Sequence, residues 1–344
     1  PKVVCALYHV TSRDFITREM REMKEHMEQR ILGTSGIQVS AIGLGCMSLG
    51  GWAYGAFPET AEAVRLVQHA LDQGITFLDT ADVYGPFTSE EIVGRAIKGR
   101  REHVVVATKG GFVVTDPSTH AMSKDGSPAH LKAACDASLR RLGIETIDLY
   151  QLHRPDPQVP IEESVQALSE LVTAGKVRAI GLSECDLPTL ERASKVHPIA
   201  TLQSELSLWT RDVLAEILPW CQAHGVAFLP FAPLGRGFLT GRYRSASQFD
   251  SNDFRSGLPR FTQEALAQNL GIVEQVEEIA RRHNATPGQV ALAWVMSLGD
   301  NVIPIPGTKH LSYLEENIGA ASLALTPEDL AQLNNLPSPV GARY

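Results

Sequence analysis

The sequence lacks the features of secreted, membrane-spanning and nucleic-acid-binding proteins. Its 344 residues include five cysteines, an odd number with no Cys-x-x-Cys pair, so free thiols in a reducing, cytoplasmic compartment are expected. No apolar stretch reaches the roughly 18 residues of a membrane span. The net charge is −8 and no long basic run occurs, which argues against a nucleic-acid or anionic-membrane partner.

The N-terminal segment, residues 1–29, lacks the small-residue cleavage site of a secretory signal and is dense in charges of both signs. We expect an appended helical or disordered extension, and an oligomer-forming arm is the alternative that leaves the oligomeric state open. Met20, Met23 and Met27 could each be a start site, so residues 1–26 need not belong to the natural domain. Residues 30–344 are predicted to form a single domain.

From residue 30 onward, short apolar segments alternate with amphipathic ones. A turn at 34–36 predicts a hairpin. Glycine stops end several predicted helices, at Gly74, Gly143, Gly175 and Gly225. The expected strands are 41–47, 76–81, 104–109, 147–153, 177–183, 201–206, 226–234 and 301–307, and the clearest helices are 61–74, 131–143, 162–175 and 273–284.

Strict alternation of eight strands with helices predicts an α/β fold, a (β/α)8 TIM-type barrel whose lower end is capped by the N-terminal hairpin. An open doubly wound sheet is the alternative. Two segments without clear periodicity, 112–128 and 236–262, are expected to be long functional loops at the C-terminal rim.

Four polar residues follow three successive strands: Asp79 and Tyr84, then Lys109, then His153. Parallel strands of a barrel end on one rim, so these side chains are predicted to meet there. An ammonium about 4 Å from a phenolate contributes about 4 kcal/mol at an effective dielectric of about 20. Lys109 is therefore expected to make Tyr84 more acidic by at most about three pKa units. Asp79 would keep Lys109 charged, and a neutral His153 could orient a carbonyl oxygen.

Each of these residues has an ordinary structural alternative. Asp79 could be a helix cap, Tyr84 a packing residue, Lys109 a surface lysine and His153 a structural histidine. Their joint placement on neighbouring strand ends favours a proton-donating site.

The segments GLGCMSLGG, FLDTADVYG, VVVATKGG, DLYQLHRPD, AGKVRAIGLSE, LQSELSLW, PLGRGFLTG, ALAW and IPIPGTKHLSYLEENIGA occur in the order found in aldo-keto reductases. The chain resembles that family from about residue 30 to about residue 336. The resemblance implies a (β/α)8 barrel, NADPH as cofactor, a tetrad of Asp79, Tyr84, Lys109 and His153, and reduction of aldehydes or ketones with Tyr84 as general acid.

The resemblance also implies a set of cofactor contacts. Phe231 would stack on the nicotinamide, with a core phenylalanine as the alternative. Ser183 and Gln203 would bind the carboxamide, and Lys309 would meet a 2′-phosphate. The remaining assigned residues are Cys46, Met47, Asp79, Glu184, Pro233, Leu234, Gly235, Gly237, Leu239, Gly241, Gly307, Tyr313, Glu316 and Asn317.

Two residues depart from the pattern of many members of the family. Tyr313 stands where many have Arg, and Glu184 stands where many have Asn. Phosphate binding thereby loses a bidentate partner, and a carboxylate cannot donate the hydrogen bonds of an amide. NADPH is still expected to be preferred because of Lys309, with NADH possible but weaker.

Aromatic residues on or after strand ends are candidate walls for a small carbonyl substrate: Trp52, Tyr54, Phe57, Phe112 and Trp209. Two other functions remain open. One is a cofactor-binding regulatory barrel resembling potassium-channel β-subunits, which keep the tetrad. The other is a metal-dependent hydrolase, which would need several converging histidines and carboxylates. Only His153 and Asp79 stand at clear strand ends, so no metal is expected.

Overall fold

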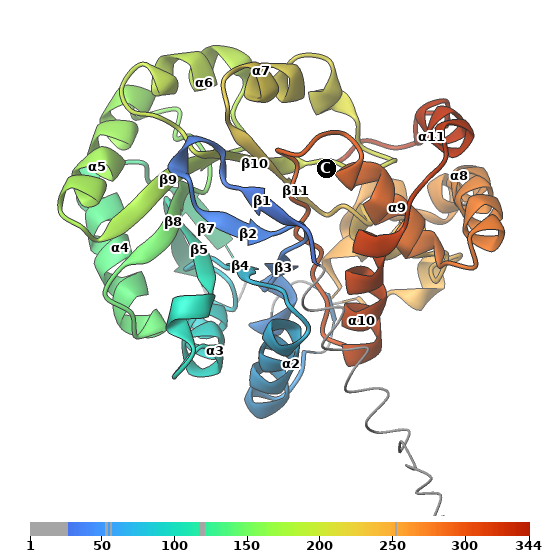
Figure 1. Ribbon diagram of the computed structural model, residues 1–344, viewed down its shortest axis with the longest axis horizontal. Helices are drawn as coiled ribbons and strands as arrows, with labels where there is room; N and C mark the ends of the chain where they lie inside the picture. The colour runs from blue at the N-terminus through green and yellow to red at the C-terminus, as the bar shows by residue number, and fades with distance from the viewer. Residues whose placement is uncertain (1–26, 52–53, 56, 117–120, 252) are drawn as a thin grey trace, which may run out of the picture.

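A barrel of parallel strands forms the centre of the computed structural model, which describes residues 27–344 except 52–53, 56, 117–120 and 252. A seven-stranded parallel sheet has the order β11-β10-β9-β8-β5-β4-β3 (Figure 1). The strands are β3 (Leu44–Gly45), β4 (Phe77–Asp79), β5 (Val105–Gly110), β8 (Ile147–Leu152), β9 (Val177–Ser183), β10 (Thr201–Glu205) and β11 (Ala227–Phe231). The predicted parallel barrel is confirmed.

The segment 301–307 closes the barrel between β11 and β3 without forming a regular strand. The Ile303 amide donates to the carbonyl of Phe228 in β11 at 2.9 Å, and the Gly43 amide donates to the carbonyl of Pro304 at 2.9 Å. Pro304 and Pro306 stand at the alternate positions whose N–H groups would face β3, and proline has none to donate. On the β3 side the segment therefore only accepts hydrogen bonds, through the carbonyls of Pro304 and Pro306, and donates none from these two residues. It nevertheless takes the predicted place of the eighth strand.

The predicted N-terminal hairpin is present as β1 (Gln29–Ile31) and β2 (Gln38–Ser40), which pair antiparallel. Figure 1 shows it lying across one end of the barrel. Leu32 and Val39 are fully buried in a cluster with Phe77 and Leu149 of the barrel strands. The hairpin is therefore an apolar plug for the barrel interior.

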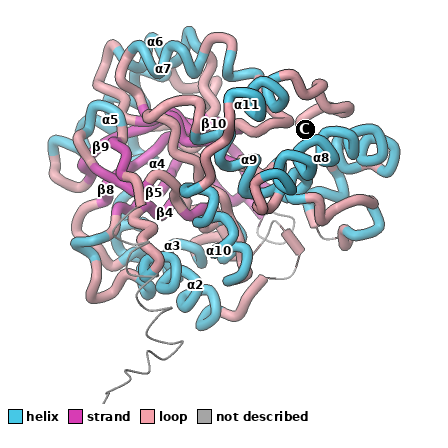
Figure 2. The backbone as a smooth tube through the Cα atoms, turned by 45° about the vertical axis from the view of Figure 1, so that its right-hand side comes forward, coloured by secondary structure: helices cyan, strands magenta, loops and turns pink. Residues whose placement is uncertain are grey.

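Ten α-helices of the described chain surround the strands (Figure 2). Their ends follow local chemistry: α4 begins where the Ser127 side chain accepts from the His130 amide, and it ends at Gly143, which is left-handed. The helices are α2 (Thr60–Asp72), α3 (Thr88–Ala96), α4 (Pro128–Leu142), α5 (Ile161–Thr173), α6 (Leu187–Ser194), α7 (Ile217–Ala223), α8 (Gln263–Arg282), α9 (Pro287–Met296), α10 (Leu311–Gly319) and α11 (Pro327–Asn334). None of the helices in the described residues is long and apolar enough to cross a membrane.

The two predicted loops differ in structure. The segment 112–128 was expected to be irregular, and this is wrong for most of it. β6 (Phe112–Asp116) and β7 (Ala121–Lys124) pair antiparallel across residues that lie outside the described part. Backbone hydrogen bonding rather than side-chain burial forms this hairpin, since β7 is exposed throughout, and burial periodicity could not reveal it. The segment 236–262 has only short 3-10 turns, as an irregular loop would.

Replacing Leu32 by alanine should destabilise the protein by about 2–5 kcal/mol, because it removes a fully buried side chain from the plug. Urea unfolding followed by circular dichroism measures this change. Ile31→Ala is the matched control, since Ile31 is 50% exposed on the same strand, and it should cost less than about 1 kcal/mol. Equal losses for both variants would contradict the plug.

Candidate active site

Lys109 lies at the centre of the candidate site, near the end of β5, and is fully buried. Its Nζ contacts Asp79 Oδ1 at 2.5 Å, and it donates to the Thr80 carbonyl at 2.8 Å and to the Tyr84 hydroxyl at 3.2 Å. Parallel pairing of β4 with β5 brings the carboxylate and the ammonium to the same rim. The ammonium therefore has an acceptor for each of its three protons, and one of these acceptors is the phenol.

His153 follows β8 directly and is buried beside Tyr84. The two rings meet edge to face with centroids 5.8 Å apart. The backbone amide of His153 donates to the Gly110 carbonyl at 2.8 Å, which holds the residue against the end of β5. Within the described residues, its buried Nδ1 has no hydrogen-bond partner. The structure thus brings together all four residues that the sequence singled out: Asp79, Tyr84, Lys109 and His153.

The electrostatics of these groups follow from burial and from one ion pair. Burial by itself would lower the pKa of Lys109, but Asp79 overrides it, so the pKa is raised and the side chain stays charged. Burial and the nearby charges of Lys109 and Arg154 hold the pKa of His153 well below its usual range, so its ring is neutral at neutral pH. The ion pair with Asp79 therefore keeps Lys109 charged, whereas His153 beside it stays uncharged.

Burial raises the pKa of Tyr84 above its ordinary value, and the opposing effect of Lys109 is smaller. The expected net acidification is therefore wrong for the protein alone, although Lys109 acts in the expected direction. The phenol keeps its proton at neutral pH, and Lys109 stands where it would stabilise the phenolate once that proton leaves.

The second oxygen of Asp79 accepts from two side-chain amides on β8 and β10, neither of which is adjacent to β4. Gln203 Nε2 in β10 donates to Asp79 Oδ2 at 2.8 Å, and Gln151 Nε2 in β8 lies 3.3 Å from the same oxygen. The buried carboxylate is thus held by an ammonium and two amides, as a buried charge requires. Sequence reasoning missed Gln151, although a polar residue inside the apolar run IDLYQLH was a signal for it.

At the end of β9 the side chain of Ser183 is buried, and at the end of β11 the ring of Phe231 is half-exposed. Ser183 Oγ accepts a hydrogen bond from Arg154 Nη1 at 2.8 Å. Phe231 contrasts with the fully buried remainder of its strand, so one aromatic surface is left at the rim. Sequence reasoning also missed Arg154, which directly follows His153.

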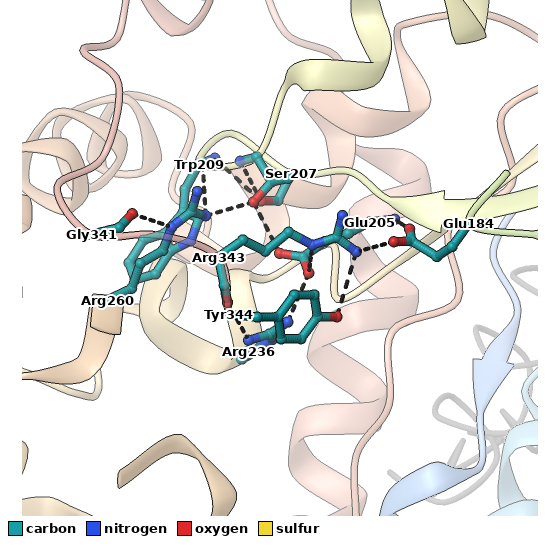
Figure 3. A network of polar contacts seen from close by, with 10 residues as sticks. Glu184, Glu205, Ser207, Trp209, Arg236, Arg260, Gly341, Arg343 and Tyr344 are labelled. Atoms are coloured by element: carbon teal, nitrogen blue, oxygen red, sulfur yellow. Dashed lines mark hydrogen bonds and ion pairs between the residues drawn. The ribbon is translucent and has the colours of Figure 1, made fainter. Parts of the chain in front are cut away.

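Glu184 is paired with the C-terminal segment (Figure 3). Its Oε1 accepts from the Glu205 amide at 3.0 Å, and its Oε2 pairs with Arg343 Nη2 at 2.6 Å. Arg343 Nε also contacts Glu205 Oε2 at 2.8 Å, and Arg236 Nη2 reaches that same oxygen at 2.8 Å. Glu184 therefore anchors the chain terminus, a contact 159 positions away that its local sequence could not indicate.

The loop after β11 turns sharply through its glycines. Gly235 and Gly237 have φ of 57° and 95°, and Arg236 between them is also left-handed at 57°. A Cβ on Gly237 would approach Tyr243 at 2.8 Å. Of the other residues assigned here, Pro233 and Leu239 are buried, Leu234 and Gly241 are half-buried, and Gly307 forms a bridge with Gly45 next to Cys46 and Met47.

The assigned residues of the far segment lie on or before α10. Lys309 Nζ donates to the Tyr54 carbonyl at 2.7 Å. Tyr313 is covered by the Arg242 guanidinium, 3.8 Å from its ring centroid, and Arg242 also pairs with Glu316 at 2.5 Å. Arg242, from the 236–262 loop, thus places its guanidinium over Tyr313, the position at which many members of the family have Arg. Asn317 is buried.

The residues predicted to line a substrate pocket differ in their surroundings. Phe112 packs edge to face on His153 at 5.0 Å, and Tyr54 packs on Phe254 at 5.2 Å. Phe57 is 63% exposed. Trp209 is only 2% exposed and packs on Phe238 and Phe261, so its prediction as a pocket wall is wrong, because this ring is part of the core. Trp52 lies outside the described residues.

A cleft of about 1150 Å³ lies at the other end of the barrel, between α3, α4 and the starts of β5 and β8. Arg101 and Arg178 line it, but both pair with the buried Asp148. It holds no phenol, imidazole or buried ammonium, so it is not the acid–base site. In the described part of the chain, no three His, Cys, Asp or Glu side chains are placed to hold a metal ion.

A parallel barrel with a carboxylate, an ammonium, a phenol and a neutral imidazole on its C-terminal rim is the architecture of a TIM-barrel enzyme. A sequence profile described as the Aldo/keto reductase family matches residues 41–337. The chain belongs to the aldo-keto reductase family.

Individual relatives agree with this assignment. The chain is 44% identical over 303 residues to "Probable aldo-keto reductase 1" of Glycine max, covering 88% of this chain and 86% of the relative. Among solved structures, the glycerol dehydrogenase AKR11B4 from Gluconobacter oxydans matches with a TM-score of 0.82 and 33% identity, over 92% of this chain and 98% of that one. An aldo-keto reductase from Klebsiella pneumoniae in complex with NADPH matches with a TM-score of 0.69 and 28% identity, over 91% and 96%.

One further buried carboxyl group beside the site makes stability depend on pH. Asp82 is 4% exposed, and within the described residues its Oδ1 has no hydrogen-bond partner. Burial, with Glu90 nearby, raises its pKa to about 7. The folded protein therefore holds a proton that the unfolded chain has already lost, between about pH 4 and pH 7.

Asp82→Asn should consequently gain stability relative to the wild type as pH rises from 4.5 to 8, by about 2–4 kcal/mol. The free energy of unfolding in urea is measured for both proteins at the two pH values. Subtracting the wild-type value from the Asp82→Asn value at each pH removes the contribution of groups that titrate alike in both proteins. Asp300→Asn, which removes an exposed carboxylate, is the control. An Asp82→Asn difference that stays constant with pH would contradict the raised pKa.

Proposed function

We propose that this protein reduces aldehydes and ketones to alcohols, with Tyr84 as the proton donor and NADPH as the source of hydride. The observation that carries the proposal is the buried Lys109 ammonium, held between Asp79 at 2.5 Å and the Tyr84 hydroxyl at 3.2 Å. The family assignment and the NADPH complex of a relative support the cofactor. Free, buried thiols at Cys46, Cys135, Cys185 and Cys221 support a reducing, cytoplasmic setting.

The described residues fit a dinucleotide of this type. Phe231 offers a half-exposed ring beside Ser183, and the loop at Gly235 and Gly237 has the left-handed backbone that lets amides approach a pyrophosphate. The buried Ser48 Oγ has no hydrogen-bond partner in the described chain, and it lies 3.7 Å from the place a Cβ on Gly307 would take. Lys309 and Arg242 supply the positive charge that a 2′-phosphate needs.

Each tetrad residue then has one task. When bound, the reduced nicotinamide supplies a hydride to the carbonyl carbon. Neutral His153 donates a hydrogen bond to the carbonyl oxygen, and Tyr84 transfers its proton to that oxygen as negative charge develops there. Lys109 stabilises the phenolate left on Tyr84, and Asp79 keeps Lys109 protonated. Hydride and proton together convert the carbonyl into an alcohol.

Tyr84→Phe should abolish reduction, with kcat lowered by about 100-fold or more, because the ring remains but the proton does not. A panel of aldehydes followed by NADPH absorbance measures this, and fluorescence titration should show NADPH affinity within about twofold of the wild type. Lys109→Met should be comparably severe. Tyr150→Phe is the control, since that phenol donates only to the Leu131 carbonyl behind the barrel.

Activity retained by Tyr84→Phe would remove Tyr84 from its role. NADPH binding by the wild type without turnover of any carbonyl compound would instead favour a cofactor-binding regulatory barrel.

Lys309→Met should lower the ratio of kcat/KM with NADPH to that with NADH by about tenfold, because one charged contact to the 2′-phosphate is lost. Lys195→Met removes an exposed lysine that caps the C-terminus of α6 and should leave the ratio unchanged. Equal efficiency of the wild type with the two cofactors would refute the expected NADPH preference.

A further inference from the structure

Two guanidinium groups lie near the half-exposed ring of Phe231, and one of them belongs to an ion-pair cluster with Arg236, Glu184 and Glu205. The Arg154 and Arg343 guanidinium carbons lie 5.8 Å and 5.6 Å from its centroid. Arg343 pairs with both Glu184 and Glu205, and Arg236, the third guanidinium, shares Glu205 (Figure 3). Both carboxylates are therefore engaged by the C-terminal segment and the loop after β11.

Arg154 is the cation of this group that has no carboxylate. Its Nη1 donates to the carbonyl of His153 at 2.6 Å and to Ser183 Oγ at 2.8 Å. Across the described residues, neither Nε nor Nη2 has an acceptor, and no Asp or Glu forms an ion pair with Arg154. These two nitrogens form the side of the guanidinium that binds a carboxylate through two parallel hydrogen bonds.

The position of Arg154 is next to the proposed reaction centre. It follows His153 in the chain, touches Ser183, and its charge acts on both His153 and Tyr84. The side chain is half-buried, and its Nη1 is fixed by the His153 carbonyl and Ser183, so the orientation of the guanidinium is set. A ligand bearing negative charge could bind the Nε and Nη2 side of this oriented guanidinium.

We propose that Arg154 is a specificity-determining residue that binds the carboxylate of an anionic substrate. The proposal rests on the carbonyl reductase function above and narrows its substrate class to aldehydes and ketones that carry a carboxylate group. The unbound fork of Arg154 holds the carboxylate while the carbonyl oxygen lies between His153 and Tyr84.

The test compares carboxybenzaldehydes with the formylbenzamides of the same shape, which differ only in the charge of one group. The ortho, meta and para isomers of each scan the distance between carbonyl and carboxylate. For at least one isomer, the wild type should prefer the acid to the amide in kcat/KM by about tenfold or more. Arg154→Gln should reduce that acid-to-amide ratio by about 10- to 100-fold, the range for one charged hydrogen-bonding pair.

Two control variants separate charge from structure. Arg154→Lys keeps a cation without the fork and should retain part of the preference. Arg192→Gln removes an exposed arginine that pairs with Glu162 on the outer helices, and its ratio should equal that of the wild type. The ratio is independent of a general loss of activity, so a merely structural role of Arg154 would leave it unchanged. No preference for any acid, or a preference that survives in Arg154→Gln, overturns the proposal.

A binding experiment keeps the inference separate from the proposed reduction. Benzoate and benzamide are titrated calorimetrically into the NADP⁺-loaded wild type and Arg154→Gln. Benzoate should bind the variant at least about tenfold more weakly, with NADP⁺ affinity retained. If none of the aldehydes is reduced but benzoate binding depends on Arg154, the reduction fails and the anion site stands. Benzoate affinity that is absent from the wild type, or equal in both proteins, overturns the site itself.

Discussion

The ion pair between Lys109 and Asp79 is the interaction on which the candidate active site depends. A fully buried ammonium is stable only with close acceptors, and this one has a carboxylate, a carbonyl and a phenol. Three strands contribute to the carboxylate's environment through Lys109, Gln151 and Gln203. The charged pair thus requires the strand order of the barrel, because a different order would leave a buried charge without partners.

Around that pair, charge is distributed so that each group has a defined state. His153 is neutral because it is buried next to two cations, and Tyr84 keeps its proton because burial outweighs the effect of Lys109. At the ends of β9 and β10, Glu184 and Glu205 balance Arg343 and Arg236. Arg154, also near Phe231, pairs with no Asp or Glu of the described residues and is the residue proposed to bind a substrate carboxylate. The C-terminal rim therefore carries charged groups whose positions are fixed by neighbouring side chains.

The sequence predicted most of the elements whose pattern is local. The helices around Gly74, Gly143 and Gly175 and the buried strands follow from periodicity and stop signals, and the tetrad follows from polar residues at strand ends. Predictions failed where an element has no buried face to give a periodic pattern, or where a side chain packs against residues distant in the sequence. The β6–β7 hairpin is exposed on β7, and Trp209 is enclosed by Phe238 and Phe261.

Amino-acid order by itself determined the alternation of strands and helices, the plugging hairpin and the polar residues that end the strands, since each depends on hydrophobic spacing within about ten residues. It also determined the family. Only the folded chain decided which oxygens of Asp79 meet which donors, how Pro304 and Pro306 close the barrel, and which arginine keeps an open fork. Those outcomes depend on contacts between distant segments, such as Asp79 with Gln203, 124 positions away, and pairing at that range is set by packing rather than by local pattern.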